Sequence, residues 1–146
     1  MPNDFPKFEE SLKIIDPYKR VEFLENALFE DIGYHKFIPY IQLHEFEALL
    51  LANPEILLME YVTAHNQIEK LKEIVVNYDN NPEKVNTGNT TAPSKRIIAL
   101  IPEYEGNKVS VGSVLAGIEG IEVQKGRCKH FADWINKIQN ISEQSV

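Results

Sequence analysis

The stretch FIPYIQLHEFEALLL, residues 37–51, is the most apolar run of the chain, and we expect the fold to be arranged around it. Its first half, 37–43, is rich in β-branched and aromatic residues and has a proline near its start, which favours a buried strand entered at that proline. Residues 48–51 are helix formers, and Asn53-Pro54 marks the next break. The polar cluster at 44–47 therefore lies where a strand is expected to pass into a helix.

This position makes the polar cluster a candidate site. In open α/β sheets, ligands bind at the carboxyl ends of the strands. An imidazole and two carboxylates placed there cost desolvation free energy unless they are paired, solvated or bound to another group. His44, Glu45 and Glu47 are therefore the first residues to consider for function.

The composition is that of one soluble globular domain, and we expect residues 1–146 to form it. Hydrophobic residues make up 43% and charged residues 25% of the chain, which is enough for a core. The formal net charge of −7 excludes binding of nucleic acid through bulk charge. Contact with a polyanion would need a local basic patch or bound metal ions.

Several features point away from membranes and from secretion. No apolar run approaches the ~18–20 residues that cross a bilayer. The N-terminus lacks the basic and apolar regions of a signal peptide. Cys128 is the only cysteine, so an intrachain disulfide is excluded. We therefore expect a cytoplasmic protein.

Helical periodicity and cap signals predict a helix-dominated α/β fold with about six helices. They are expected over residues 16–33, 54–61, 65–78, 97–101, 109–118 and 128–141. The remaining segments are predicted to be non-helical: an extended N-terminal segment at 1–15, a long polar loop at 78–94, a loop at 103–106, and a turn with one short extended piece at 120–126. Because a lone strand is not a stable sheet, the strand at 37–43 needs a partner from 122–124, from the N-terminal segment or from outside this chain.

The first candidate site admits two interpretations. If the helix has begun by His44, then His44 and Glu47 share one face, and imidazole with carboxylate suits zinc, manganese or iron. Carboxylates alone suit magnesium or manganese. In the alternative, Glu45 and Glu47 simply favour a helix N-terminus through its dipole, and His44 is a boundary residue.

Two basic clusters give the second and third candidates. Ser94-Lys95-Arg96 opens a helix after the long polar loop, so amide groups, helix dipole and two cations favour a phosphate site. The alternative is a solvated basic pair beside a capping serine. Arg127, Lys129 and His130 precede aromatic residues, which suits nucleic acid, although such aromatics also suit a core with charges at its rim.

Three motifs in this order resemble the domain of unknown function 4276 family: the stretch at 37–51 followed by Asn-Pro and a helix, APSKRI at 92–97, and CKHFADWI at 128–135. The resemblance runs from about Asp4 to Ile141 and departs at 103–117, where a more basic loop is expected. It implies a Toprim-like fold, related to the nuclease domain of the overcoming-lysogenization-defect proteins. Members occur in bacteria near restriction-modification and other phage-defence genes.

The resemblance also implies strands that this sequence lacks. Members of the family begin with a strand carrying a V-E-G-type glutamate and a second strand carrying an aspartate, and these two side chains bind magnesium. This sequence begins just past the place where they would lie. We therefore expect the C-terminal part of a longer Toprim-like protein, which retains a partial remnant of the sheet.

By the same resemblance, His44, Glu45 and Glu47 would stand at the metal centre, with Glu45 and Glu47 as the catalytic carboxylates. Ser94, Lys95 and Arg96 would contact the polynucleotide phosphate. The chemistry implied is phosphodiester hydrolysis assisted by Mg or Mn, in which cations position water and neutralise developing charge.

Three functions follow as expectations. The first is the C-terminal portion of a metal-dependent nuclease of a bacterial defence system, inactive alone. The second is a non-catalytic interaction or regulatory protein of a defence locus, in which the polar cluster caps a helix and Lys95-Arg96 lies at a protein interface. The third is a metal-dependent hydrolase of small phosphate esters. An exposed sheet edge would also favour a homo-oligomer or a defence-system partner protein.

Overall fold

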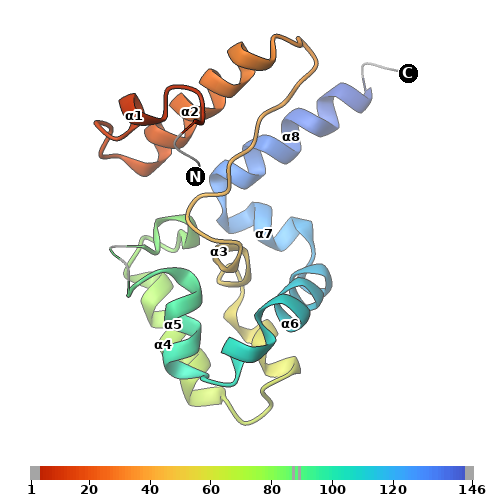
Figure 1. Ribbon diagram of the computed structural model, residues 1–146. Coiled ribbons are helices and arrows are strands. Elements are labelled where there is room, and N and C mark those ends of the chain that lie inside the picture. Colours follow the sequence, from red (N-terminus) through yellow and green to blue (C-terminus); the bar gives the residue numbers. More distant parts are fainter. Residues whose placement is uncertain (1–3, 87, 89, 144–146) are drawn as a thin grey trace. The chain divides into compact units, whose positions relative to one another are not determined.

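The computed structural model describes residues 4–86, 88 and 90–143, except for the side chains of 142 and 143. Every regular element in that part of the chain is helical (Figure 1), which confirms the helix-dominated prediction. The chain divides into two compact units, which we describe separately. The first contains residues 1–43 and 133–146, and the second contains residues 44–132.

The first unit is built on α2 (Pro17–Ile32), whose ends follow from local signals in the sequence. The Asp16 side chain accepts a hydrogen bond from the Lys19 amide at 3.0 Å, and Pro17 occupies the first helical position. Gly33 ends the helix with φ 63°, a conformation that suits glycine. The helix predicted for residues 16–33 is therefore confirmed.

The strand expected over residues 37–43 is wrong for the described part of the chain, where these residues form an irregular connection. Their polar and aromatic groups find other partners in the same unit. The Ile41 amide donates to Glu25 Oε1 at 2.7 Å, and the Tyr40 ring stacks on Trp134 with centroids 4.5 Å apart. The apolar pattern correctly indicated burial, but a ladder also requires a neighbouring strand.

Neither segment offered as a partner strand is extended as expected. Residues 121–127 form α7 (Ile121–Arg127), where a turn with an extended piece was predicted. Gly120, with φ 85°, lets the chain pass directly from one helix into the next. The segment 1–15 contains α1 (Phe8–Ser11), and its residues 1–3 lie outside the described part.

The second unit is arranged around α3 (Glu47–Leu50), so the opening stretch does organise the fold, as a helix rather than a strand. The elements that follow α3 are η1 (Pro54–Met59), α4 (His65–Val76), η2 (Pro82–Lys84), α5 (Pro93–Leu100), α6 (Tyr104–Glu119), α7 and the start of α8 (Lys129–Glu143). Helix α3 contacts η1, η2, α5 and α6. A short central helix therefore serves as the hub of this unit.

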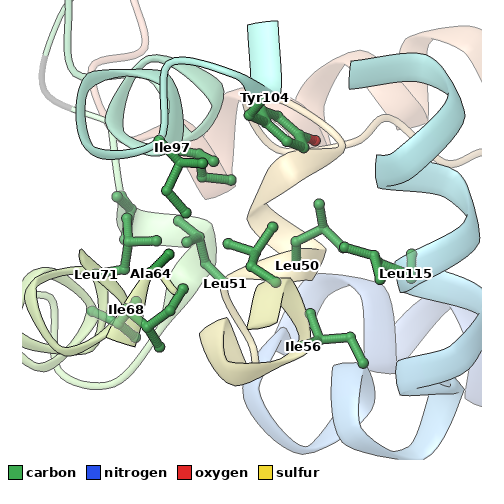
Figure 2. Packing of buried hydrophobic residues seen from close by; sticks show 14 residues of the cluster. Leu50, Leu51, Ile56, Ala64, Ile68, Leu71, Ile97, Tyr104 and Leu115 are labelled. Atoms are coloured by element: carbon green, nitrogen blue, oxygen red, sulfur yellow. The ribbon is translucent and has the colours of Figure 1, made fainter. Parts of the chain in front are cut away.

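Leu50 and Leu51 are fully buried at the centre of the core. Figure 2 shows them with Leu115 on one side and with Ile68 and Ile97 on the other. Such close packing leaves little room for change, because deleting a buried leucine side chain to alanine costs about 2–5 kcal/mol.

The remaining predicted boundaries are mostly right, with three differences. Residues 54–59 form a 3-10 helix, and α5 begins at Pro93, one residue before the serine that was predicted to open it and four before its first predicted apolar residue, Ile97. The loop predicted at 103–106 is wrong, because α6 begins at Tyr104, whose ring is fully buried. Helices α4 and α8 match their predictions closely. No helix in the described residues is long and apolar enough to cross a membrane.

Candidate functional site

His44 occupies the junction before α3 in a left-handed conformation, with φ 63°. Its Nδ1 lies 3.1 Å from Asn86 Nδ2, and its Nε2 is buried without a hydrogen-bond partner in the described residues. Because an amide nitrogen only donates, this contact makes Nδ1 the acceptor and leaves the proton on Nε2. Asn86 Oδ1 accepts from the Gly88 amide at 3.1 Å, which holds the Asn86 amide in this orientation, so a cation at Nδ1 would have to displace the Asn86 contact.

Burial lowers the pKa of His44, and this effect outweighs the neighbouring Glu45 charge, which raises it. The ring is therefore held in its neutral form at neutral pH. Neutral imidazole is the form that binds metal ions.

Glu45 caps α5 from a distant part of the chain. Its Oε2 accepts a hydrogen bond from the Ser94 amide at 2.8 Å. Ala92, at the N-cap position, has no side chain able to make this contact. A carboxylate at a helix N-terminus is stabilised both by the hydrogen bond and by the helix dipole. One oxygen of Glu45 is thus committed to the fold.

Glu47 faces α6 instead of the pocket described below. Its side chain is 7% exposed, and its Oε1 lies 3.3 Å from Lys108 Nζ. The Tyr104 hydroxyl donates to the same oxygen at 3.4 Å, and burial raises the pKa of Tyr104. The charge of Glu47 is therefore paired with Lys108 and hydrogen-bonded by Tyr104, both of which belong to α6.

The three residues at the start of α5 have different surroundings. Ser94 is fully buried, its amide is taken by Glu45, and its Oγ has no hydrogen-bond partner in the described residues. Lys95 is exposed. Arg96 donates to the Thr91 carbonyl at 3.0 Å and to the Tyr78 hydroxyl at 3.1 Å. The Ser94 amide is thus not free to bind a phosphate. The side chains of Lys95 and Arg96 follow directly after the long polar loop and supply positive charge there.

A pocket of about 470 Å³ lies beside these groups. It is lined by His44, Glu45, Asn86, Gly88 and Ala92. Of the predicted metal ligands, the structure therefore brings together His44 and Glu45 but not Glu47. Among the residues that the structure describes, no group of three or more His, Cys, Asp or Glu side chains is placed to hold a metal ion.

Asn86 and Glu83 are the residues of this region that sequence reasoning missed. Asn86 lies in the polar loop 78–94, whose length is typical of a functional or mobile segment, so its neighbourhood was indicated although its role was not. Glu83 is fully buried and accepts hydrogen bonds from the amides of His130 and Phe131, both at 2.9 Å. Nothing in the local sequence signals this contact, because the partners lie 47 and 48 residues away.

Comparisons with known proteins identify a family for this chain. No curated protein and no solved structure matches the chain. A family model described as "Domain of unknown function (DUF4276)" matches residues 3–139, which is nearly the whole chain. The resemblance carried by the motifs at 37–51, 92–97 and 128–135 is thereby confirmed, and the chain belongs to the DUF4276 family.

Proposed function

We propose that this chain is part of a Toprim-like, metal-dependent nuclease of a bacterial defence system and does not cleave on its own. The observation that supports this is the pocket bordered by one neutral imidazole and one carboxylate. It lies at the start of α5, where Lys95 and Arg96 supply positive charge. A cation beside two basic residues suits a phosphodiester substrate.

The pocket offers only part of a ligand set, which is why the chain alone is proposed to be inactive. His44 and Glu45 would hold the cation, and Asn86 is close enough to His44 to assist. Manganese accepts imidazole and carboxylate together, whereas magnesium prefers oxygen ligands and keeps several waters. When bound, such a cation would position water and neutralise developing charge on the phosphate.

The same proposal extends to the segment 37–43. Its β-branched and aromatic residues suit a strand, and we propose that it joins a Toprim-like sheet when partner strands are supplied from outside the described residues. The Ile41 amide would then exchange its bond to Glu25 for a ladder bond.

Calorimetric titration with manganese and with magnesium tests the cation site. Glu45→Gln keeps an oxygen that can accept from the Ser94 amide but removes the charge, so it separates metal binding from helix capping. We expect the parent chain to bind manganese with measurable heat. In Glu45→Gln the affinity for manganese should fall at least about tenfold, since a charged ligand is lost. Glu60→Gln, at an exposed carboxylate outside this pocket, is the matched control and should bind as the parent chain does.

A second function is favoured by a specific observation: Glu45 and Glu47 both have protein donors already. This supports a non-catalytic interaction or regulatory protein, in which the two carboxylates only stabilise the fold. The titration distinguishes the two functions. If neither ion gives heat, or if Glu45→Gln binds manganese as well as the parent chain, the nuclease proposal fails and the non-catalytic function remains.

A further inference from the structure

We propose that five basic side chains gathered around the turn at residues 78–84 form a surface for the phosphodiester backbone of a nucleic acid. This surface, called the basic rim below, consists of Lys84, Lys95, Arg96, Arg127 and Lys129. The inference rests on the proposed nuclease function and extends it, because it assigns Lys84, Arg127 and Lys129 to substrate binding.

The contacts of one turn bring Lys84, Arg96 and Arg127 together from three parts of the sequence, and the exposed Lys95 precedes Arg96 in α5. Arg96, from α5, donates to the Tyr78 hydroxyl and lies over the Tyr78 ring at 5.6 Å. Arg127, from the end of α7, donates to Asn80 Oδ1 at 3.4 Å. Lys84 is joined to Asp79, within the turn itself, at 2.8 Å. The turn therefore has a cation in contact with each of Tyr78, Asp79 and Asn80.

Glu83 adds the fifth cation to the same place. Its buried carboxylate accepts from the amides of His130 and Phe131, which fixes the first turn of α8 against η2. Lys129 opens that turn of α8 and is exposed, and Lys84 directly follows Glu83 in η2. The Glu83 contacts thus join the two elements that carry these lysines, which are far apart in the sequence.

The rim is positive although the chain is acidic. Five of the chain's 15 Lys and Arg residues lie in the rim, while the formal net charge of the whole is −7. The two acidic residues of the turn, Asp79 and Glu83, offset part of this charge, but the five cations outnumber them. Asp79 is paired with Lys84, and the Glu83 carboxylate is buried against two amides. A local excess of cations is what a phosphate backbone recognises, through release of its counterions.

The rim also borders the candidate cation pocket, which favours a polynucleotide over a small phosphate. Arg96 Nε donates to the Thr91 carbonyl, and the next residue, Ala92, lines the pocket beside Glu45. A backbone bound along the rim would therefore run toward the pocket. A single small phosphate would need only one or two of these cations.

Fluorescence anisotropy with labelled single-stranded DNA, duplex DNA and single-stranded RNA tests the rim, with EDTA present to remove divalent cations. We expect binding to at least one of the three at low ionic strength. Arg127→Ala with Lys129→Ala should weaken it about 10- to 100-fold, and the slope of log affinity against log salt should fall by about 1.4 for single strands or 1.8 for duplex DNA. Lys70→Ala with Lys137→Ala, at two exposed lysines outside the rim, is the charge-matched control.

The possible results separate the two proposals. Because EDTA is present, binding here does not depend on a cation in the pocket. If nucleic-acid binding weakens in the rim variant but calorimetry shows no heat with manganese, the basic rim is supported and the proposed metal centre is contradicted. If no nucleic acid binds, or if the rim and control variants lose affinity equally, the rim is overturned whatever calorimetry shows. Thermal melts of both variants, at exposed positions, check that each remains folded.

Discussion

Helices α5 and α8 begin in the same way, and the comparison between them separates structure from function. In each helix, backbone amides of the first turn donate to a side chain that is distant in the sequence. Each takes a glutamate from a distant part of the chain: Glu45 binds the Ser94 amide, and Glu83 binds the amides of His130 and Phe131. The contact is the same, but the surroundings of the two carboxylates differ.

Glu83 is fully buried and both of its oxygens accept hydrogen bonds from α8. Glu45 is partly exposed, uses one oxygen for its contact with the Ser94 amide of α5 and borders a pocket beside His44. A sealed carboxylate with both oxygens engaged is suited to holding a fold together. A carboxylate at the edge of a pocket is also placed to meet a ligand. Under our proposal, the difference in burial, and not the capping contact itself, makes Glu45 rather than Glu83 the candidate cation ligand.

The largest effect is expected for Glu83→Ala. The change leaves two amides of α8 without their charged acceptor and empties a buried position. Hydrogen bonds to charged groups contribute about 1.5–3 kcal/mol each, so the free energy of unfolding should fall by about 3–5 kcal/mol. Denaturant unfolding at neutral pH measures it. Glu105→Ala, at an exposed site, is the control and should change little. A loss below about 1 kcal/mol would show that α8 does not depend on this cap.

The features that could be predicted from the sequence are those with local causes. The ends of α2 follow from Asp16, Pro17 and Gly33, which lie within or next to the helix. The apolar stretch at 37–51 correctly identified the centre of the molecule's larger unit. Its strand was not predictable in the same way, because apolar composition indicates burial, whereas a ladder depends on residues elsewhere.

The candidate site shows the same limit. The sequence placed His44 beside Glu45, and the structure keeps both at one pocket. It grouped Glu47 with them on the assumption that the helix had begun by His44. Instead, His44 has φ 63° and α3 begins at Glu47, so the two residues do not share a helix face. The caps made by Glu45 and Glu83 span 49 and 47 residues, which no local pattern indicates.

Glu119 is a third carboxylate to set beside Glu45 and Glu83, and its two oxygens differ in their hydrogen bonding. Its Oε2 accepts from Gln124 at 3.1 Å, but its Oε1 is buried without a hydrogen-bond partner in the described residues. Burial raises the pKa of Glu119 from 4.5 to about 7. In the unfolded chain the carboxyl loses its proton near its ordinary pKa, while the folded protein retains it until about pH 7. Stability should therefore fall as the pH rises between these values and stay lower above them.

Glu119→Gln tests this prediction, because glutamine keeps an acceptor for Gln124 but does not titrate. Near pH 4 the variant and the parent chain should have similar free energies of unfolding. Near pH 8 the variant should be more stable by about 1–3 kcal/mol. Chemical denaturation at both pH values measures the difference. A stability difference that is the same at both would contradict the raised pKa.

The smallest effects are expected at Glu45, and they decide whether its second role is real. Glu45→Ala removes a single helix cap at a partly exposed site, so the free energy of unfolding should fall by about 1 kcal/mol. Glu45→Gln keeps the acceptor and should cost only a few tenths of a kcal/mol, since little but the interaction with the helix dipole is lost. If glutamine instead costs as much as Glu83→Ala, then the Glu45 charge is as structural as that of Glu83. The burial difference between the two caps would then not indicate function, because a carboxylate whose charge is required for folding is not available as a cation ligand.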